Sequence, residues 1–219
     1  METHSIVHNA DCLAAMKEYP ENYFQLCIAD PPYGINAANF NMGSRKTVRP
    51  DKKQWDIKPP DQSYFKEMFR ISQNQIFFGG NYFDLPPTRC FIIWDKGETM
   101  YGRSFAECEM AWTSFDASAR MFKLSPNQLN RIHTCEKPIA LYKWILQNYA
   151  KQGDRIIDPF LGSGSSRIAA YDLGFDFTGY ELDTDYFEAQ ERRFAEYIKQ
   201  PKLFEPIQQI EKQEGLFSL

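Results

Sequence analysis

Acidic residues that stand at the ends of strand-like apolar runs constrain this fold more than any other feature. Asp30, Asp158 and Glu181 each end such a run, and Asp11 follows the strand-like segment 5–8. Amphipathic segments typical of helices separate the runs. This alternation predicts an α/β fold with one doubly wound, mostly parallel sheet and helices on both faces. Because ligands bind beyond the carboxyl ends of strands in such a sheet, the four carboxylates are expected at one site.

The expected elements divide the whole chain, 1–219, into one domain. Asp11 is predicted to cap the first helix. The predicted helices cover 12–19, 62–72, 138–149, 165–173 and 185–198, and the predicted strands cover 5–8, 75–78, 90–94, about 108–114, and segments at Arg155 and Asp176.

A short motif at one strand end carries residues suited to a weakly nucleophilic amine. In Asp30-Pro31-Pro32-Tyr33 the carboxylate can accept one N–H, and the following main-chain carbonyl can accept the second, because proline fixes φ and has no donor. Two acceptors outside the ring plane would favour a more tetrahedral, more nucleophilic nitrogen. Tyr33 is suited to stack on a base that has left its helix. The alternative is a polyproline turn after a buried strand.

A glycine-rich turn follows a second acidic strand end. The segment Asp158-Pro159-Phe160-Leu161-Gly162-Ser163-Gly164 precedes a helix expected to begin near Ser165, whose N-terminus supplies donors and positive potential. Glu181 comes about 20 positions after Gly162, a spacing suited to ribose hydroxyls. A dinucleotide site is an alternative, although Arg167 stands where the usual third glycine would be.

Together the two motifs resemble the S-adenosylmethionine-dependent amino-methyltransferases of DNA. Their order, with Asp-Pro-Pro-Tyr before the Asp-x-Phe-x-Gly-Ser-Gly loop, is similar to the permuted beta class. The resemblance extends to the segments 9–13, 75–82, 92–96 and 133–138. The last segment departs from the family pattern at Thr134 and Cys135, where the family has proline and threonine.

The resemblance implies a Rossmann-like methyltransferase fold, S-adenosylmethionine as cofactor, and methyl transfer to the exocyclic N6 of adenine in a flipped-out DNA base. The family more often pairs Asp-Pro-Pro-Tyr with adenine N6 and Ser-Pro-Pro-Tyr with cytosine N4. The implied catalytic residues are Asp30, Pro31, Pro32 and Tyr33. The implied cofactor-binding residues are Asp11, Cys12, Lys137, Asp158, Pro159, Phe160, Gly162, Ser163, Gly164 and Glu181.

Composition excludes several classes of protein. The chain has no run of 18 apolar residues and no signal peptide at Met1, so a protein of the cytoplasm without membrane spans is expected. Five scattered cysteines indicate reduced thiols rather than a disulfide framework. Three histidines without ligand spacing argue against a metal site.

A net charge of −4 does not favour nucleic-acid binding by the whole surface, so a DNA surface must be local or supplied by a second subunit in a homodimer. The polar segment 36–60 follows Tyr33 directly and is predicted to be a DNA-contacting loop rather than a merely solvated one. A short target-recognition segment is expected at 115–132. The predicted DNA-binding residues are Arg45, Lys46, Arg49, Lys52, Lys53, Arg120, Lys123 and Arg131.

Three alternatives to adenine methylation of DNA remain open at this stage. One is transfer to cytosine N4, and another is methylation of an RNA base, since RNA also presents splayed-out bases. The third is a non-catalytic nucleic-acid-binding subunit with a methyltransferase-like fold. The complete motif at Asp30 and the complete loop at Gly162 argue against the third.

Replacing Lys46, Arg49, Lys52 and Lys53 together by glutamine is expected to weaken DNA binding and flatten its salt dependence. Each lost phosphate contact should lower the log–log slope by about 0.9 on duplex DNA. Salt titrations of DNA affinity for the wild type and the quadruple variant measure this. Identical slopes would show that the segment is only solvated.

Overall fold

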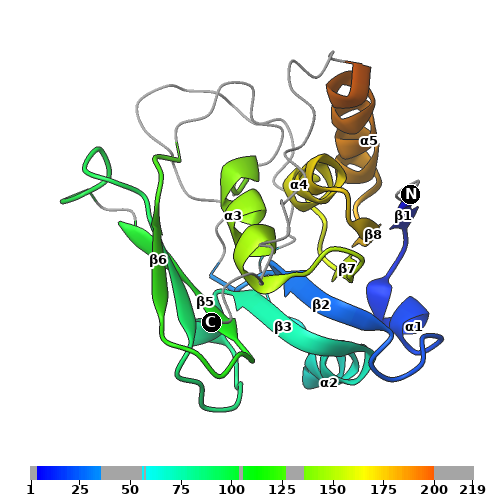
Figure 1. Ribbon diagram of the computed structural model, residues 1–219, viewed down its shortest axis with the longest axis horizontal. Helices are drawn as coiled ribbons and strands as arrows, with labels where there is room; N and C mark the ends of the chain where they lie inside the picture. The colour runs from blue at the N-terminus through cyan, green and yellow to red at the C-terminus, as the bar shows by residue number, and fades with distance from the viewer. Residues whose placement is uncertain (1–3, 36–55, 57, 104–105, 127–135, 200–219) are drawn as a thin grey trace, which may run out of the picture.

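The computed structural model describes residues 4–35, 56, 58–103, 106–126 and 136–199, which form an eight-stranded sheet flanked by helices (Figure 1). In chain order the elements are β1 (Ser5–Asn9), α1 (Cys12–Met16), β2 (Phe24–Ala29), α2 (Gln62–Ile71), β3 (Ser72–Phe78), the 3-10 helix η2 (Gly80–Tyr82), β4 (Phe91–Asp95), β5 (Cys108–Thr113), β6 (Arg120–Lys123), α3 (Ile139–Tyr149), β7 (Arg155–Asp158), α4 (Ser165–Leu173), β8 (Asp176–Glu181) and α5 (Thr184–Lys199).

Parallel pairing dominates the sheet, whose strand order is β1-β8-β7-β2-β3-β5-β4-β6. The first five strands in this order pair in parallel throughout. Strand β5 runs antiparallel to both of its neighbours, and β6 pairs in parallel with β4. The predicted α/β class with a mostly parallel sheet is therefore confirmed.

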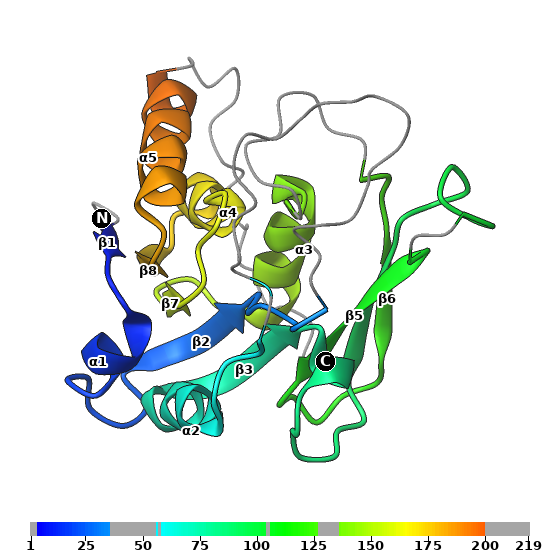
Figure 2. The same cartoon turned by 180° about the vertical axis from the view of Figure 1, so that it is seen from behind.

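Helices cover both faces of the sheet, as predicted. Figures 1 and 2 show α2 on one side of β2 and β3, and α3 and α4 on the other. Within β2, Leu26 and Ile28 pack into the cluster that contains α3, while Cys27 and Ala29 pack into the cluster that contains α1 and α2. This alternation is the two-residue period of a strand that is buried on both faces.

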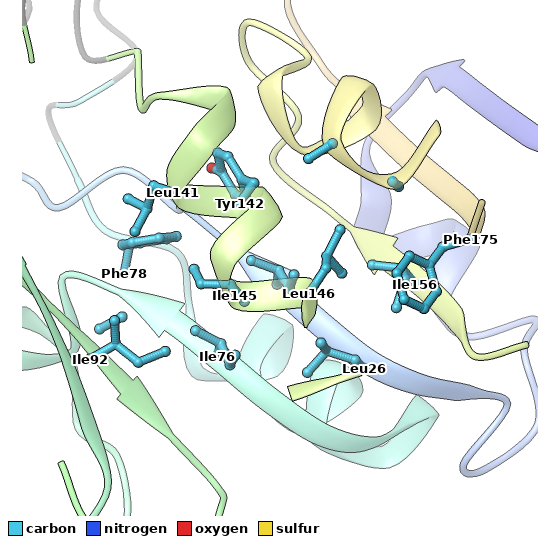
Figure 3. Close-up of a cluster of buried hydrophobic side chains, with 14 of the residues drawn as sticks. Leu26, Ile76, Phe78, Ile92, Leu141, Tyr142, Ile145, Leu146, Ile156 and Phe175 are labelled. Carbon is cyan, nitrogen blue, oxygen red and sulfur yellow. The ribbon is translucent and has the colours of Figure 1, made fainter. Parts of the chain in front are cut away.

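The larger cluster lies under α3 (Figure 3). Ile76 of β3 lies near Ile145 of the helix, and Ile156 of β7 lies beside Phe175. None of the three isoleucines is more than 1% exposed. Burial of such side chains stabilises the fold by roughly 1.5–3 kcal/mol each. The packing fixes the strand ends, and so the groups that follow them.

The structure differs from the predicted elements in several places. Strand β3 begins at Ser72, where the predicted helix was to end, rather than at Gln75. The first helix ends at Met16 rather than Tyr19, although Asp11 caps it as expected, accepting a hydrogen bond from the Leu13 amide at 2.9 Å. Strand β6 was not predicted. Its burial is slight and its sequence carries two cations, so neither alternation nor apolar content marked it.

The crossovers change faces between β7 and β2. The helix after β7 is α4, which packs with α3, whereas the helix after β2 is α2, on the opposite face. This is a topological switch point, where the ends of adjacent strands form a crevice. In the described part of the chain, no helix is long and apolar enough to span a membrane.

Candidate active site

A pocket of about 1470 Å³ lies at the carboxyl ends of the strands around this crevice. Its lining joins residues that follow β1, β2, β7 and β8, among them Asp11, Asp30, Gly162 and Glu181. The pocket therefore unites the two motifs that are far apart in the sequence.

Two carboxylates hold the glycine-rich turn after β7. Asp158 accepts hydrogen bonds from the Phe160 amide at 3.0 Å and from the Ser166 hydroxyl at 2.5 Å. Glu181 accepts from the Gly162 amide at 2.8 Å and, through its other oxygen, from the Asp183 amide at 2.8 Å. Each carboxylate oxygen keeps a second lone pair, so Glu181 can still accept from a ligand hydroxyl.

Burial makes this edge of the sheet unfavourable for further negative charge. It raises the pKa of Asp158 to about 7 against the lowering effect of the Ser166 and Phe160 donors. It also raises the pKa of Glu181, although backbone amides oppose the shift. A cationic ligand would favour the ionised form of both groups.

The Asp30-Pro31-Pro32-Tyr33 motif forms a compact polar cluster after β2. The Tyr33 hydroxyl donates to one oxygen of Asp30 at 2.7 Å, and the Lys137 ammonium donates to the other. One face of the Tyr33 ring is stacked on Tyr82, with the ring centroids 5.0 Å apart and the planes at 12°. Burial raises the pKa of Asp30, an effect that Lys137 opposes.

Lys137 also approaches a second carboxylate, that of Glu109 on β5, at 3.3 Å. Glu109 is bound in turn by Lys96, which follows β4, at 2.8 Å. Burial alone would raise the pKa of Glu109, but the two lysines hold it below its usual value.

Gly79 has no side chain and so leaves space for the Tyr33 ring that packs against it. Its φ is +68°, and a Cβ atom at this position would lie 2.3 Å from the Tyr33 ring. Both the backbone conformation and the close contact therefore require glycine here.

Comparison with known proteins agrees with this architecture. Residues 93–192 match the family model described as DNA methylase, of the N6/N4 type. The chain resembles the N6/N4 DNA methylases. The matched region contains the glycine-rich turn, Glu181, Glu109 and Lys137, whereas the Asp30 motif precedes it.

Three methylase relatives show how far the similarity extends. YubD of Escherichia coli (strain K12), whose name assigns it provisionally to the methylases, is 23% identical over 207 residues, which cover 84% of this chain and 88% of YubD. The structure of M1.HpyAVI in complex with SAM has a TM-score of 0.55 at 18% identity and covers 86% of this chain and 98% of that one. The cytosine-N4-specific PvuII DNA methyltransferase has a TM-score of 0.60 at 14% identity, with coverage of 88% and 87%. S-adenosylmethionine, the cofactor expected from the sequence, is thus present in a methylase of the same fold.

Most of the methylase site residues predicted from the sequence come together. The pocket is lined by Asp11, Cys12, Asp30, Pro31, Pro32, Tyr33, Lys137, Pro159, Phe160, Gly162, Ser163 and Glu181. Asp158 is buried beneath the turn, and Gly164, with φ +74°, precedes the first residue of α4. Lys137 lines the same pocket, and its ammonium donates to Asp30.

The residues predicted to bind DNA are only partly described. Arg120 donates to Asn148 at 2.6 Å, and Lys123 pairs with Glu98 at 3.2 Å, both on the exposed surface around β6. The remaining predicted ones, Arg45, Lys46, Arg49, Lys52, Lys53 and Arg131, lie outside the described residues, as do His133, Thr134 and Cys135. Among described residues no group of acidic, histidine and cysteine side chains is arranged to hold a metal ion.

The sequence did not predict several pocket residues, four of which contact or accommodate the predicted ones. Tyr64 of α2 donates to both oxygens of Asp11 at 3.1 Å, and Glu109 binds Lys137. Neither lies in a motif that was identified. Lys96 and Gly79 do lie in segments that resemble family motifs, and their contacts required the tertiary structure.

Gly79→Ala is expected to lower the free energy of unfolding more than Gly102→Ala does. Both positions have similar left-handed φ, +68° and +71°, which costs roughly 1–2 kcal/mol for a residue with a Cβ. Only Gly79 adds a collision, with Tyr33, because nothing lies within 4 Å of a Cβ at Gly102. Urea denaturation of both variants measures the difference, and equal losses would contradict the packing described for Tyr33.

Proposed function

We propose that this protein transfers a methyl group from S-adenosylmethionine to the exocyclic N6 of adenine in DNA. The observation that carries the proposal is the shared pocket. The glycine-rich turn with Glu181 and the Asp30 motif open into the same space, so a methyl donor and an acceptor amine would meet there.

The residues around the glycine-rich turn fit the cofactor. The carboxylate of Glu181 offers acceptors for ribose hydroxyls, and the backbone at Gly162 leaves room for close approach, whereas Gly164 packs against Gln190. Buried Asp158 and partly buried Glu181 favour a positive charge nearby. S-adenosylmethionine carries such a charge on its sulfur and supplies an activated methyl group when bound.

Asp30 and Tyr33 are suited to prepare the acceptor. In the mechanism we infer, Asp30 accepts one N–H of the amine and the main-chain carbonyl after it accepts the other. This favours a nitrogen whose lone pair points at the methyl group. Tyr33 stacks on the base, which requires the base to insert beside Tyr82 or to displace it, because Tyr82 covers one face of the ring.

The choice of adenine rests on the Asp-Pro-Pro-Tyr sequence, which in relatives is found more often with adenine. DNA contacts are assigned to the segment 36–60, with the short segment 115–132 selecting the sequence. A homodimer would bring a second set of cations to the duplex.

Asp30→Ala is expected to lower the rate of methyl transfer by about 10²–10⁴-fold, because the amine loses an N–H acceptor. Glu188→Ala is the control, since Glu188 is an exposed carboxylate on α5. The assay uses a labelled methyl donor with duplex DNA, single-stranded DNA or RNA, followed by nucleoside analysis. Activity of Asp30→Ala within about tenfold of wild type would reject its role, and label on cytosine or only on RNA would correct the substrate.

Gly162→Val and Glu181→Ala are expected to weaken S-adenosylmethionine binding. The valine would block close approach of the backbone, and the alanine would remove an acceptor together with the anchor of the Gly162 amide. Calorimetry measures the affinity. Gly153→Val is the matched control, since Gly153 also has a positive φ, +90°, but does not line the pocket. Unchanged affinity in both site variants would place the cofactor elsewhere.

A further inference from the structure

Four charges of alternating sign form a chain that leads into the pocket. The ammonium of Lys96 lies 2.8 Å from the carboxylate of Glu109, which lies 3.3 Å from the ammonium of Lys137. Lys137 in turn contacts the carboxylate of Asp30. They come from β4, β5, the segment before α3, and the end of β2. Such a chain balances its own charge, so each member can be held away from water.

Lys137 is the best buried member, with 3% of its side chain exposed. Its ammonium donates to Asp30, approaches the Tyr33 hydroxyl at 3.2 Å, and lies 4.6 Å from the centre of the Phe78 ring. Two carboxylates, a hydroxyl and an aromatic face thus surround one cation. This arrangement fixes the ammonium on the catalytic carboxylate rather than on the glycine-rich turn.

We infer that Lys137 is a positioning residue, held in place by Glu109 and Lys96, that keeps Asp30 ionised and oriented toward the acceptor amine. The inference rests on the proposed methyl transfer for its functional meaning, but the state of Asp30 can be measured without it. It gives Lys137 a role different from the cofactor contact that the sequence implied.

The physical need for a cation arises from burial. A carboxyl group out of water favours its neutral form, and a protonated Asp30 would present a donor where the amine needs an acceptor. Lys137 opposes this effect on the pKa of Asp30, whereas Glu109 adds to it. The two partners therefore act on Asp30 with opposite sign. The titratable or charged groups around Asp30 are Tyr33, Lys137, Glu109, Tyr142 and Asp158, with Lys96 behind Glu109.

Lys137→Met tests the inference through the pH dependence of kcat. Activity that requires ionised Asp30 falls as pH falls through its pKa. Removing the cation raises that pKa, so the acidic limb should move to higher pH by about 1–3 pH units. The kcat at neutral pH should also fall, because a shift of one pKa unit changes the ratio of ionised to protonated Asp30 tenfold. The affinity for S-adenosylmethionine should change less than about threefold.

Glu109→Gln is expected to shift the acidic limb in the opposite direction, toward lower pH. Adding it to Lys137→Met removes a negative charge near Asp30 and should return the acidic limb toward lower pH. Lys96→Met should move the acidic limb to higher pH by less than Lys137→Met does, because Lys96 acts on Asp30 through Glu109. Lys96→Met replaces Lys137→Met as the test if the latter does not fold. Lys143→Met removes a cation paired with Asp172 in the helical layer and should leave the limb in place.

Carboxyl-carbon NMR of Asp30 in the substrate-free protein, assigned with Asp30→Asn, reports the same titration independently of activity. An upward move in Lys137→Met, smaller in the double variant, supports the inference. Unchanged titration in Lys137→Met and Lys96→Met, or weaker cofactor binding as the sole effect of Lys137→Met, overturns it. A wild-type protein that methylates no nucleic acid would instead reject the proposed function, while the NMR titration would still decide the role of Lys137.

Discussion

The parallel pairing of β2 with β7 is the constraint on which the site depends. It aligns Leu26 with Ile156 and Cys27 with Ile157, so that Asp30 and Asp158 leave the sheet side by side. Both strands are buried on both faces, and a register slip of one residue would exchange the side chains of the two clusters. The packing of the two apolar clusters therefore fixes the strand register, and the register fixes where Asp30 and Asp158 lie.

Burial at these strand ends gives the site its electrostatic character. Each carboxylate has specific partners: backbone amides for Glu181, a serine and an amide for Asp158, and a tyrosine and a lysine for Asp30. Groups with such shifted pKa values in a pocket are typical of functional sites, where burial and neighbouring charges tune the pKa values of reacting groups. The two halves differ in kind. The half around the glycine-rich turn has an excess of buried acid, which suits a cation, whereas the Asp30 half is balanced by two lysines.

The methylase family match covers the region from Ile93 to Arg192, so it includes the cofactor turn and Lys137 but not Asp30. The chain order of the two motifs does not affect how they meet, because parallel strands bring their carboxyl ends to one edge whichever strand comes first. This explains how proteins of the same fold with 14–18% identity keep the overall arrangement at TM-scores of 0.55 and 0.60. The fold is the shared element.

The sequence by itself determined the α/β class, nearly all elements and the edge at which the carboxylates gather, because alternation of apolar runs and the residues that end them are local properties. It also predicted Asp30, Gly162 and Glu181 as site residues, and these three line one pocket. Only the tertiary structure decided the partners of those groups. The contact of Lys137 with Asp30 could not be predicted from the sequence. Glu109 had no local signal, because an ion pair between β5 and the segment before α3 depends on strand order. Strand β6 was missed for a related reason: an exposed edge strand has too little apolar pattern to be recognised before its neighbour β4 is in place.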